Sequence, residues 1–442
     1  MKASSEHSIT QFDVNSLTPH PDNPRVHSKA QIKQIANSIE SFGFKIPILV
    51  DRNHQIIAGH GRVEAAKLLN MAAVPAVVAN DLTSIQSRAL MIADNKLTEN
   101  AQWDTQLLAN NFQILNDLDL NFDLDVTGFD YGEIEQLLIL DEPALENQEN
   151  LLDIDASLPA VSQLGDIWQL GKHRIVCGNS LNSDSYKTLL GEQTAQLVFS
   201  DPPYNLPSST IGKVCEKQHG NFQFASGEMS QEAFIEFLTT VFSHCRDFSN
   251  DGSIHYHCMD WRHLQDIITA GLSTYDELKN ICVWVKDRAG MGTFYRSQHE
   301  MVMVFKKGGA THQNHFKLGQ NGRYRTNVWS YPAVRMVDDT GSDSQDALSI
   351  HPTVKPVAMI MDALQDCSRQ HENILDPFLG SGSTLIACEK TKRCCYGIEI
   401  EPKYINATIR RWQAMTGLDA VCLSRNKQRF SELEQHGENT HD

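Results

Sequence analysis

The chain has 442 residues and a formal net charge of −17, and 41% of its residues are hydrophobic, so we expect two or three folded domains. No apolar stretch is long enough to span a bilayer and the first residues are polar, which predicts no membrane partner, no secretory signal and a cytoplasmic location. All ten cysteines follow residue 176 without a CxxC pair, which argues against a disulfide framework and a structural zinc site.

Residues 1–96 predict a small α+β domain of short strands and helices. Ser28 is suited to cap a helix whose apolar face runs to Phe42, and Gly43 is suited to end it. The expected elements are, in order, a strand at 9–14, that helix, a hairpin at 48–57, a helix from 62, a strand at 74–78 and a helix from Thr83 to Ala93.

This segment resembles the ParB/sulfiredoxin-like domain through Asn23-Pro24-Arg25, the turn Gly59-His60-Gly61-Arg62 and Asp94-Asn95-Lys96. The family cradles a nucleotide phosphate with this turn and the following helix start, so the resemblance implies a nucleotide or DNA site at Gly59, Gly61 and Arg62. The sulfiredoxin branch needs a cysteine in the turn, and none precedes Cys177, so that chemistry is excluded. The partition-protein branch usually has Gly-Glu-Arg-Arg here, so nucleotide binding stays open, and Arg62 paired to a surface acid is the alternative.

Residues 97–160 form an acidic connector, which we expect to be helical at first and an exposed linker near its end. Residues 1–96 carry a net charge of +2, the connector holds fifteen acids and no Lys or Arg, and residues 161–442 total −4. The acidity is therefore concentrated in one segment, and the flanking parts keep the capacity to present basic faces. A solvated surface is the plainer interpretation of the acidic run, and repulsion or mimicry of DNA is the alternative.

Residues 161–442 alternate strands and helices, which predicts a largely parallel α/β sheet. The apolar strand at 195–199 runs into Asp201-Pro202-Pro203-Tyr204, where two prolines end the strand and keep the backbone stiff. Ligands bind at the carboxyl ends of strands in such sheets, so the motif predicts one half of a site. A proline turn with a surface aspartate is the alternative.

The second half of this predicted site begins where a later strand ends at Asp376. The turn Phe378-Leu379-Gly380-Ser381-Gly382 then opens a helix through Ser383 and Thr384, and the next strand carries Glu399. A carboxylate about 20 residues after a Gly-x-Gly turn is suited to ribose hydroxyls. A dinucleotide is the competing ligand, but Asp376 would place negative charge beside its pyrophosphate, and suits an ammonium or sulfonium group better.

Together these residues resemble the amino-group DNA methyltransferases that use S-adenosylmethionine, in the motif order of the beta class. The resemblance implies a Rossmann-like methyltransferase sheet, with Asp201-Pro202-Pro203-Tyr204 as the catalytic motif. It also implies double-stranded DNA as the partner and a target base that leaves the helix. The cofactor contacts that it implies are Asp376, Phe378, Gly380, Gly382, Ser383, Thr384, Glu399, His351, Thr353 and Lys355.

The catalytic motif predicts a mechanism for an exocyclic amine, whose lone pair is delocalised into the base. Asp201 is placed to accept one N–H and the Pro202 carbonyl the other while Tyr204 stacks on the base, so positioning suffices without a metal. Methylation of a ring carbon would need a cysteine after a proline, and no Pro-Cys pair occurs. The leading Asp201 favours adenine N6 over cytosine N4. A ParB-like, nucleotide-gated DNA-binding regulator is the alternative from another class.

Target recognition is expected within residues 205–350, between the two halves of the site. A basic stretch interleaved with aromatic residues suits phosphates and bases, and the candidates for DNA binding are Arg296, Lys317, Arg323, Tyr324 and Arg325. The stretch from Tyr295 to Glu300 also resembles the methyltransferase family. His255 and His257 share one face of a strand without a pattern of metal ligands, so we expect no metal. The recognition sequence and the oligomeric state, a homodimer included, stay open.

Overall fold

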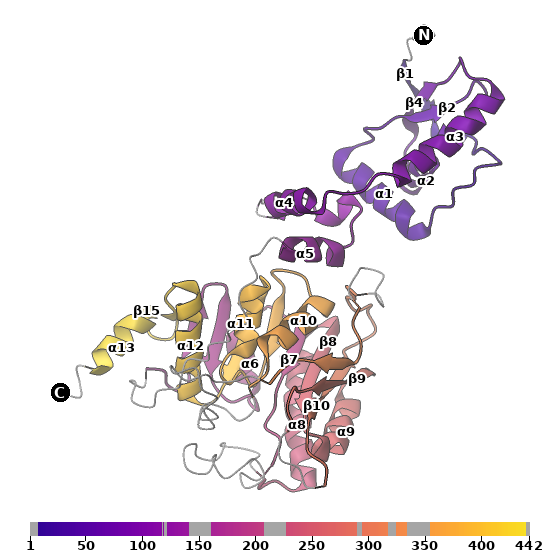
Figure 1. The fold of residues 1–442 in the computed structure, drawn as a ribbon. Coiled ribbons are helices and arrows are strands. Elements are labelled where there is room, and N and C mark those ends of the chain that lie inside the picture. Colours follow the sequence, from indigo (N-terminus) through magenta and orange to yellow (C-terminus); the bar gives the residue numbers. More distant parts are fainter. Residues whose placement is uncertain are drawn as a thin grey trace. The chain divides into compact units, whose positions relative to one another are not determined.

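The computed structural model of the protein describes residues 8–116, 118, 122–140, 161–206, 227–289, 294–316, 324–333 and 354–438. The chain divides into two compact units, Met1–Leu145 and Glu146–Asp442 (Figure 1). Each unit has its own sheet. The predicted boundary at residue 96 falls inside the first unit, which also contains the α-helices at Thr105–Asn116 and Tyr131–Leu140.

The first unit is a small sheet accompanied by helices. Its elements are β1 (Ile9–Asp13), η1 (Val14–Ser16), α1 (Lys29–Phe42), β2 (Ile48–Val50), β3 (Ile56–Ala58), α2 (His60–Leu68), β4 (Ala73–Val78), α3 (Ser84–Glu99), α4 (Thr105–Asn116), η2 (Leu124–Thr127) and α5 (Tyr131–Leu140). The strand order is β1-β4-β2-β3, with β2 and β4 parallel. Ser28 accepts a hydrogen bond from the Gln31 amide and Gly43 ends α1, as predicted. The helix capped by Thr83 runs past Ala93 because no breaker interrupts it.

The second unit is a mixed sheet between helices. Its elements are β5 (Ile167–Leu170), β6 (His173–Cys177), α6 (Ser183–Leu190), β7 (Ala195–Ser200), α8 (Gln231–Asp247), β8 (Ser249–Met259), η3 (Trp261–His263), α9 (Leu264–Thr274), β9 (Glu277–Val285), β10 (His299–Lys306), β11 (Val328–Ser330), α10 (Val357–Cys367), β12 (Asn373–Asp376), α11 (Ser383–Lys390), β13 (Cys394–Glu399), α12 (Pro402–Thr416), β14 (Val421–Cys422), β15 (Gln428–Arg429) and α13 (Phe430–Glu438).

The sheet of the second unit has the order β11-β9-β10-β8-β7-β12-β13-β6-β5-β14-β15. Its central strands β8, β7, β12, β13 and β6 are parallel, which confirms the predicted α/β class. The flanks differ from a largely parallel sheet, because β10 is antiparallel to both β8 and β9, and β5 is antiparallel to β6. The turn between β5 and β6 is too short for the crossover that parallel pairing requires.

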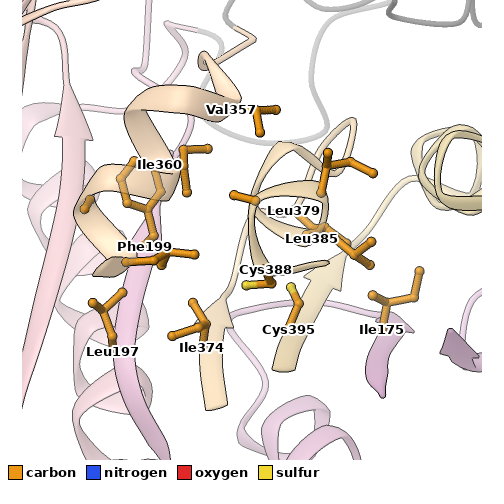
Figure 2. Close-up of a cluster of buried hydrophobic side chains, with 14 of the residues drawn as sticks. Ile175, Leu197, Phe199, Val357, Ile360, Ile374, Leu379, Leu385, Cys388 and Cys395 are labelled. Atoms are coloured by element: carbon orange, nitrogen blue, oxygen red, sulfur yellow. The ribbon is translucent and has the colours of Figure 1, made fainter. Parts of the chain in front are cut away.

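Helices cover both faces of the central strands and bury them. Leu197 and Phe199 of β7 pack with α10 and α11 on one face, as Figure 2 shows for the labelled side chains. Val198, which lies between them in the sequence, packs with α6 and α8 on the opposite face. Successive side chains of a strand point to opposite faces, so burial on both faces demands the continuous apolar run of β7.

Candidate active site

Three acidic side chains meet at one edge of the sheet. Asp201 directly follows β7, Asp376 is the last residue of β12, and Glu399 is the last residue of β13. These strands are neighbours, with β12 parallel to both β7 and β13. The carboxyl ends of neighbouring parallel strands lie side by side, so the two predicted halves of the site come together here despite their separation along the chain.

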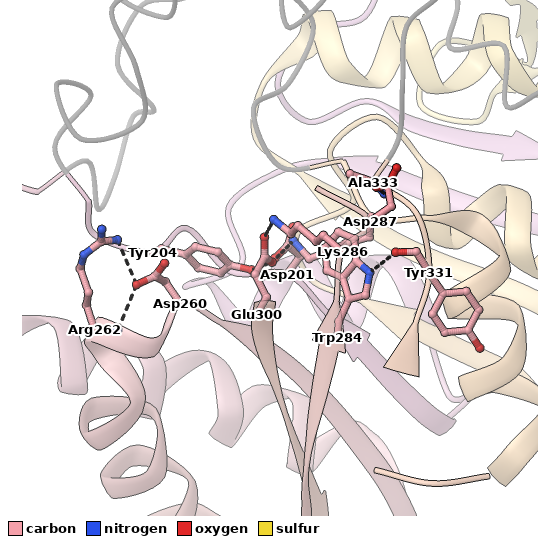
Figure 3. A network of polar contacts seen from close by, with 11 residues as sticks. Asp201, Tyr204, Asp260, Arg262, Trp284, Lys286, Asp287, Glu300, Tyr331 and Ala333 are labelled. Carbon is pink, nitrogen blue, oxygen red and sulfur yellow. Dashed lines mark hydrogen bonds and ion pairs between the residues drawn. The ribbon is translucent and has the colours of Figure 1, made fainter. Parts of the chain in front are cut away.

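The Lys355 side chain bridges two carboxylates beside the Asp201 motif. Its Nζ lies 2.7 Å from Asp201 Oδ2 and 3.1 Å from Glu300 Oε2. The Tyr204 hydroxyl lies 2.7 Å from Asp201 Oδ1 and 2.9 Å from Glu300 Oε2, so it donates to one of the two at a time. Figure 3 shows Asp201, Tyr204 and Glu300 converging. Both oxygens of Asp201 therefore face a hydrogen-bond donor.

Glu300 enters this network from the antiparallel flank of the sheet. It lies on β10 opposite Trp284 of β9, and its Oε1 accepts a hydrogen bond of 2.5 Å from Lys286 Nζ. The Lys286 ammonium also lies 4.7 Å from the centre of the Trp284 ring, whose Nε1 donates to the Tyr331 carbonyl (Figure 3). The sequence alone predicted no role for Glu300 or Lys286. The only signal was that Glu300 ends a stretch resembling the methyltransferase family.

Burial and charge act in opposite directions on these groups. Burial raises the pKa of Asp201, the Lys355 ammonium opposes that rise, and the Glu300 carboxylate adds to it. Burial also favours a higher pKa for Glu300, but Lys355 and Lys286 outweigh it and lower this pKa to about 2. Burial favours a lower pKa for Lys355, yet the two carboxylates raise it above its ordinary value. Glu300 and Lys355 are therefore charged near neutral pH, and Asp201 is the group balanced between opposing influences.

The glycine-rich turn after β12 is built around the two other acids. The Gly380 amide donates to Glu399 Oε2 over 2.9 Å, and the Glu401 amide donates to Oε1 over 2.8 Å. The Phe378 amide donates to Asp376 Oδ1 over 3.0 Å. Gly382 caps α11 with φ +82°, and a Cβ there would lie 2.6 Å from Thr408 Cγ2. The turn therefore requires glycine at this position.

The electrostatics of this turn suit a cofactor that brings positive charge and hydroxyl donors. Burial raises the pKa of Asp376 to about 7, although hydrogen bonds from Thr384 and the Phe378 amide oppose the rise. Burial likewise raises the pKa of Glu399 to about 7, although hydrogen bonds from the backbone amides of Glu401, Gly380 and Ile400 oppose the rise. Buried carboxylates are stabilised by a cation or by further donors. An ammonium or sulfonium group near Asp376 and ribose hydroxyls at Glu399 would supply them, so these residues fit S-adenosylmethionine.

The remaining predicted contacts of the second unit divide into three groups. Arg325 is held by Asp366 and Asp362, at 2.9 and 3.1 Å, and by the Tyr331 hydroxyl at 2.9 Å, so its guanidinium ties the segment before β11 to α10. Arg296 and Tyr324 are exposed. The other predicted residues lie outside the described ones: Lys317, Arg323, His351 and Thr353. The predicted DNA contact at Arg325 thus has acids of its own chain as partners.

The buried histidines of β8 bond within the core. His255 Nδ1 and His257 Nε2 lie 3.0 and 2.9 Å from the same Tyr275 hydroxyl. Burial lowers the pKa of His257 to about 3, which keeps it neutral. Within the residues that the structure describes, no cluster of His, Cys, Asp and Glu is arranged to hold a metal ion. No helix in that part of the chain is long and apolar enough to cross a membrane.

The glycine-rich turn of the first unit opens α2. Gly59 adopts φ +99°, and a Cβ there would lie 2.9 Å from Arg62 Nη2, so the Arg62 guanidinium folds back over the turn. Gly61 packs against His27, and His60 Nε2 accepts a hydrogen bond of 3.3 Å from the His20 amide. Burial lowers the pKa of Arg62, and Asp94 opposes that change. The structure thus brings Gly59 and Arg62 together at a helix N-terminus.

Comparison with known proteins gives two family matches and several relatives. The family model described as DNA methylase matches residues 195–410, and the one described as ParB N-terminal domain matches residues 1–96. "ParB-like nuclease domain-containing protein YnaK" of Escherichia coli K12 is 42% identical over 80 residues, 18% of this chain and 92% of that protein. "DNA adenine methyltransferase YhdJ" of the same organism is 25% identical over 263 residues, 54% of this chain and 82% of that protein.

Among solved structures, that of the M1.HpyAVI–SAM complex is similar to this chain with a TM-score of 0.37 and 18% identity, over 54% of this chain and 98% of the other.

The strand-end acids, the glycine-rich turn and the DNA methylase match together define an S-adenosylmethionine-dependent methyltransferase that acts on DNA. Within that class, the chain contains an N6/N4-type DNA methylase domain, matched over residues 195–410, and a ParB N-terminal domain, matched over residues 1–96.

Proposed function

We propose that this DNA methyltransferase modifies the exocyclic N6 amine of adenine and that Asp201 and Tyr204 position the flipped base. The placement of Asp201 supports this proposal most directly, because its carboxylate follows β7 beside the strands that end in the cofactor acids. The motif begins with aspartate, and one relative is named a DNA adenine methyltransferase. Cytosine N4 is the other amine of the family.

The chain's residues act by holding the amine and stabilising its charge. S-adenosylmethionine, when bound, supplies a methyl group on a positively charged sulfur, which becomes a neutral thioether as the methyl leaves. Asp201 accepts one N–H and the Pro202 carbonyl the other, which directs the nitrogen lone pair away from them toward the methyl group. The nitrogen gains positive charge as its new bond forms, and Asp201 stabilises that charge until a proton leaves to water. Tyr204 supports the ring of the base by stacking.

The identity of the methylated base tests the proposal directly. The protein is incubated with labelled S-adenosylmethionine and mixed-sequence duplex DNA, and the DNA is then digested to nucleosides and separated by mass. We expect N6-methyladenine to carry the label. Label in N4-methylcytosine alone would overturn the adenine assignment, and no label in either base, with cofactor binding intact, would overturn the proposed activity as a whole.

We predict that Asp201→Ala abolishes methyl transfer while cofactor binding is largely kept. Loss of one preorganised partner of a reacting group costs about 100-fold or more in kcat. The measurement is single-turnover transfer together with cofactor titration by calorimetry. Asp184→Ala is the matched control, because Asp184 lies on α6 in an exposed ion pair with Lys187. Survival of activity in the Asp201 variant would show that the catalytic assignment is wrong.

We also propose three functional segments: a ParB-like module at 1–96, an acidic connector at 97–160 and the methyltransferase at 161–442, with target recognition within 205–350. The module's role is to hold or locate DNA. The start of α2, with Gly59, Gly61 and Arg62, suits a phosphate group because backbone amides and a guanidinium lie together there. Deletion of residues 1–96 should therefore weaken DNA engagement and leave cofactor binding intact.

A further inference from the structure

The target amine needs the same Asp201 oxygens that other groups occupy in this structure. Lys355 Nζ lies 2.7 Å from Oδ2, and the Tyr204 hydroxyl lies 2.7 Å from Oδ1. We propose that the Lys355 ammonium holds the place of the target amine on Asp201, and that Glu300 is the positioning residue that receives this ammonium when the base enters. This inference rests on the proposed role of Asp201 as the acceptor of the amine.

The geometry makes Glu300 the natural acceptor of the displaced ammonium. Lys355 Nζ already lies 3.1 Å from Glu300 Oε2, so a small displacement exchanges one carboxylate for the other. The Lys355 side chain is only 3% exposed, and a buried ammonium needs a compensating carboxylate because water does not reach it. The Glu300 side chain is 8% exposed and is fixed at its other oxygen by Lys286. A receiving carboxylate is therefore preformed.

The charges of this cluster balance before the base arrives. Two carboxylates, Asp201 and Glu300, face two ammonium groups, Lys355 and Lys286. The other titratable groups near Asp201 are Tyr204 and, at longer range, Cys258 and Asp376, and all of these are neutral or anionic. Lys355 is thus the one described cation that directly favours the ionised form of Asp201. Glu300 weakens that effect by sharing the same ammonium.

Removal of Glu300 and removal of the shared Lys355 ammonium should move the acid limb of the kcat–pH profile in opposite directions. In Glu300→Gln the ammonium is no longer shared with Glu300 and keeps its contact with Asp201, so the pKa of Asp201 falls and the limb moves to lower pH. In Lys355→Met the hydrogen bond from Tyr204 still opposes burial and Glu300 but the ammonium no longer does, so the pKa of Asp201 rises and the limb moves to higher pH. A charge within 4–6 Å changes a pKa by about one unit or more, so shifts of that size are expected. A purely structural role would lower stability without these opposite shifts.

The two variants should also be non-additive in kcat on the pH-independent plateau. We expect Glu300→Gln to lower kcat by about tenfold in the natural chain, because the carboxylate that receives the displaced Lys355 ammonium is then missing. In the Lys355→Met background the same change should cost less than about twofold, since no ammonium remains to be received. Equal losses in both backgrounds would overturn the proposed exchange.

Matched controls and a second variant keep this test decisive. Glu277→Gln and Lys279→Met, an exposed ion pair on β9, should leave the profile unchanged. If Lys355→Met does not fold, Lys286→Met replaces it: Glu300 then attracts Lys355 more strongly, and the limb moves to higher pH. No shift in any of the variants at Glu300, Lys355 and Lys286, while the natural chain methylates adenine, overturns this inference alone. Absence of transfer by the natural chain itself would instead overturn the proposed function.

Discussion

A bound cofactor with positive charge and hydroxyl donors favours the ionised form of the Asp376 and Glu399 carboxyls. Their pKa values near 7 follow chiefly from burial, and the ordinary values of such groups lie about three units lower. In the absence of cofactor, each is therefore mostly protonated at pH 6 and mostly ionised at pH 8. When cofactor groups that favour the ionised form bind, the two carboxyls therefore lose these protons.

We predict that the affinity for S-adenosylmethionine rises from pH 6 to pH 8, by up to about tenfold for each carboxyl. Binding lowers the two pKa values, so the free protein holds more protons than the complex, and raising the pH favours the complex. Calorimetry in two buffers with different ionisation enthalpies measures the released protons. Glu399→Gln is the comparison and should reduce the release to that of Asp376. Equal affinity and no proton release across this range would contradict the prediction.

At the scale of single residues, the sequence predicted the positions of site residues at the ends of parallel strands. It did not predict the site residue that comes from the antiparallel flank of the sheet. Asp201, Asp376 and Glu399 could be placed because each follows an apolar strand, and parallel strands end together. Glu300 could not, because its position depends on the register of β10 against β9, which no local pattern encodes. Arg325 looked like a DNA contact from its basic and aromatic neighbours, but its acidic partners lie on α10, far along the chain.

Elements bring these residues together, and the turn before α11 is the most constrained of them. Gly382 combines a positive φ with a close approach of Thr408 from α12. The backbone strain and the contact are separate costs. A side chain at positive φ costs about 1–2 kcal/mol, whereas the contact must be relieved by moving either the turn or α12.

We predict that Gly382→Ala weakens cofactor binding by about tenfold or more and lowers the melting temperature, because the turn that holds Glu399 must shift. Gly417→Ala is the matched control: Gly417 has φ +70°, and a Cβ there would meet no atom within 4 Å, so this variant reports the strain alone. Adding Thr408→Ala to Gly382→Ala should restore part of the affinity. Equal losses in affinity for the two glycine variants would show that the contact with Thr408 does not matter.

The central elements of the sheet were predictable because continuous apolar runs, helix caps and glycine stops are local signals. The antiparallel flanks were not, because strand direction there depends on turns and long connections. The short turn between β5 and β6 is the exception, since its length alone allows only antiparallel pairing. The antiparallel flank that contains β10, which was not predicted, carries Glu300.

The whole molecule joins two units with separate sheets, which suggests separable roles. We predict that deleting residues 1–96 leaves cofactor affinity unchanged and lowers methylation of long duplexes by about tenfold, because a linked DNA-binding module raises the local concentration of sites. On a short duplex that holds only the target, the two proteins should be equally active. Competition assays with the long and short duplexes measure the difference.

The full chain with Arg62→Ala serves as the comparison for this deletion, because it removes the guanidinium over the turn without deleting any helix or strand of the module. A loss on long DNA in both proteins would place the contact at the start of α2. Unchanged activity of the deleted protein on long DNA would refute a DNA-engaging role for the module.

The adjacency of β7, β12 and β13 has a consequence for how such enzymes diversify. The site depends on which strands are neighbours in the sheet and not on which comes first along the chain. A gene rearrangement could place the cofactor-binding half before the catalytic half in the sequence. The same strands would still form the same site at their carboxyl ends, provided that the new loops were long enough to connect them. The order of the motifs along the chain can therefore change during evolution, while Asp201, Asp376 and Glu399 still lie together at the carboxyl ends of neighbouring strands.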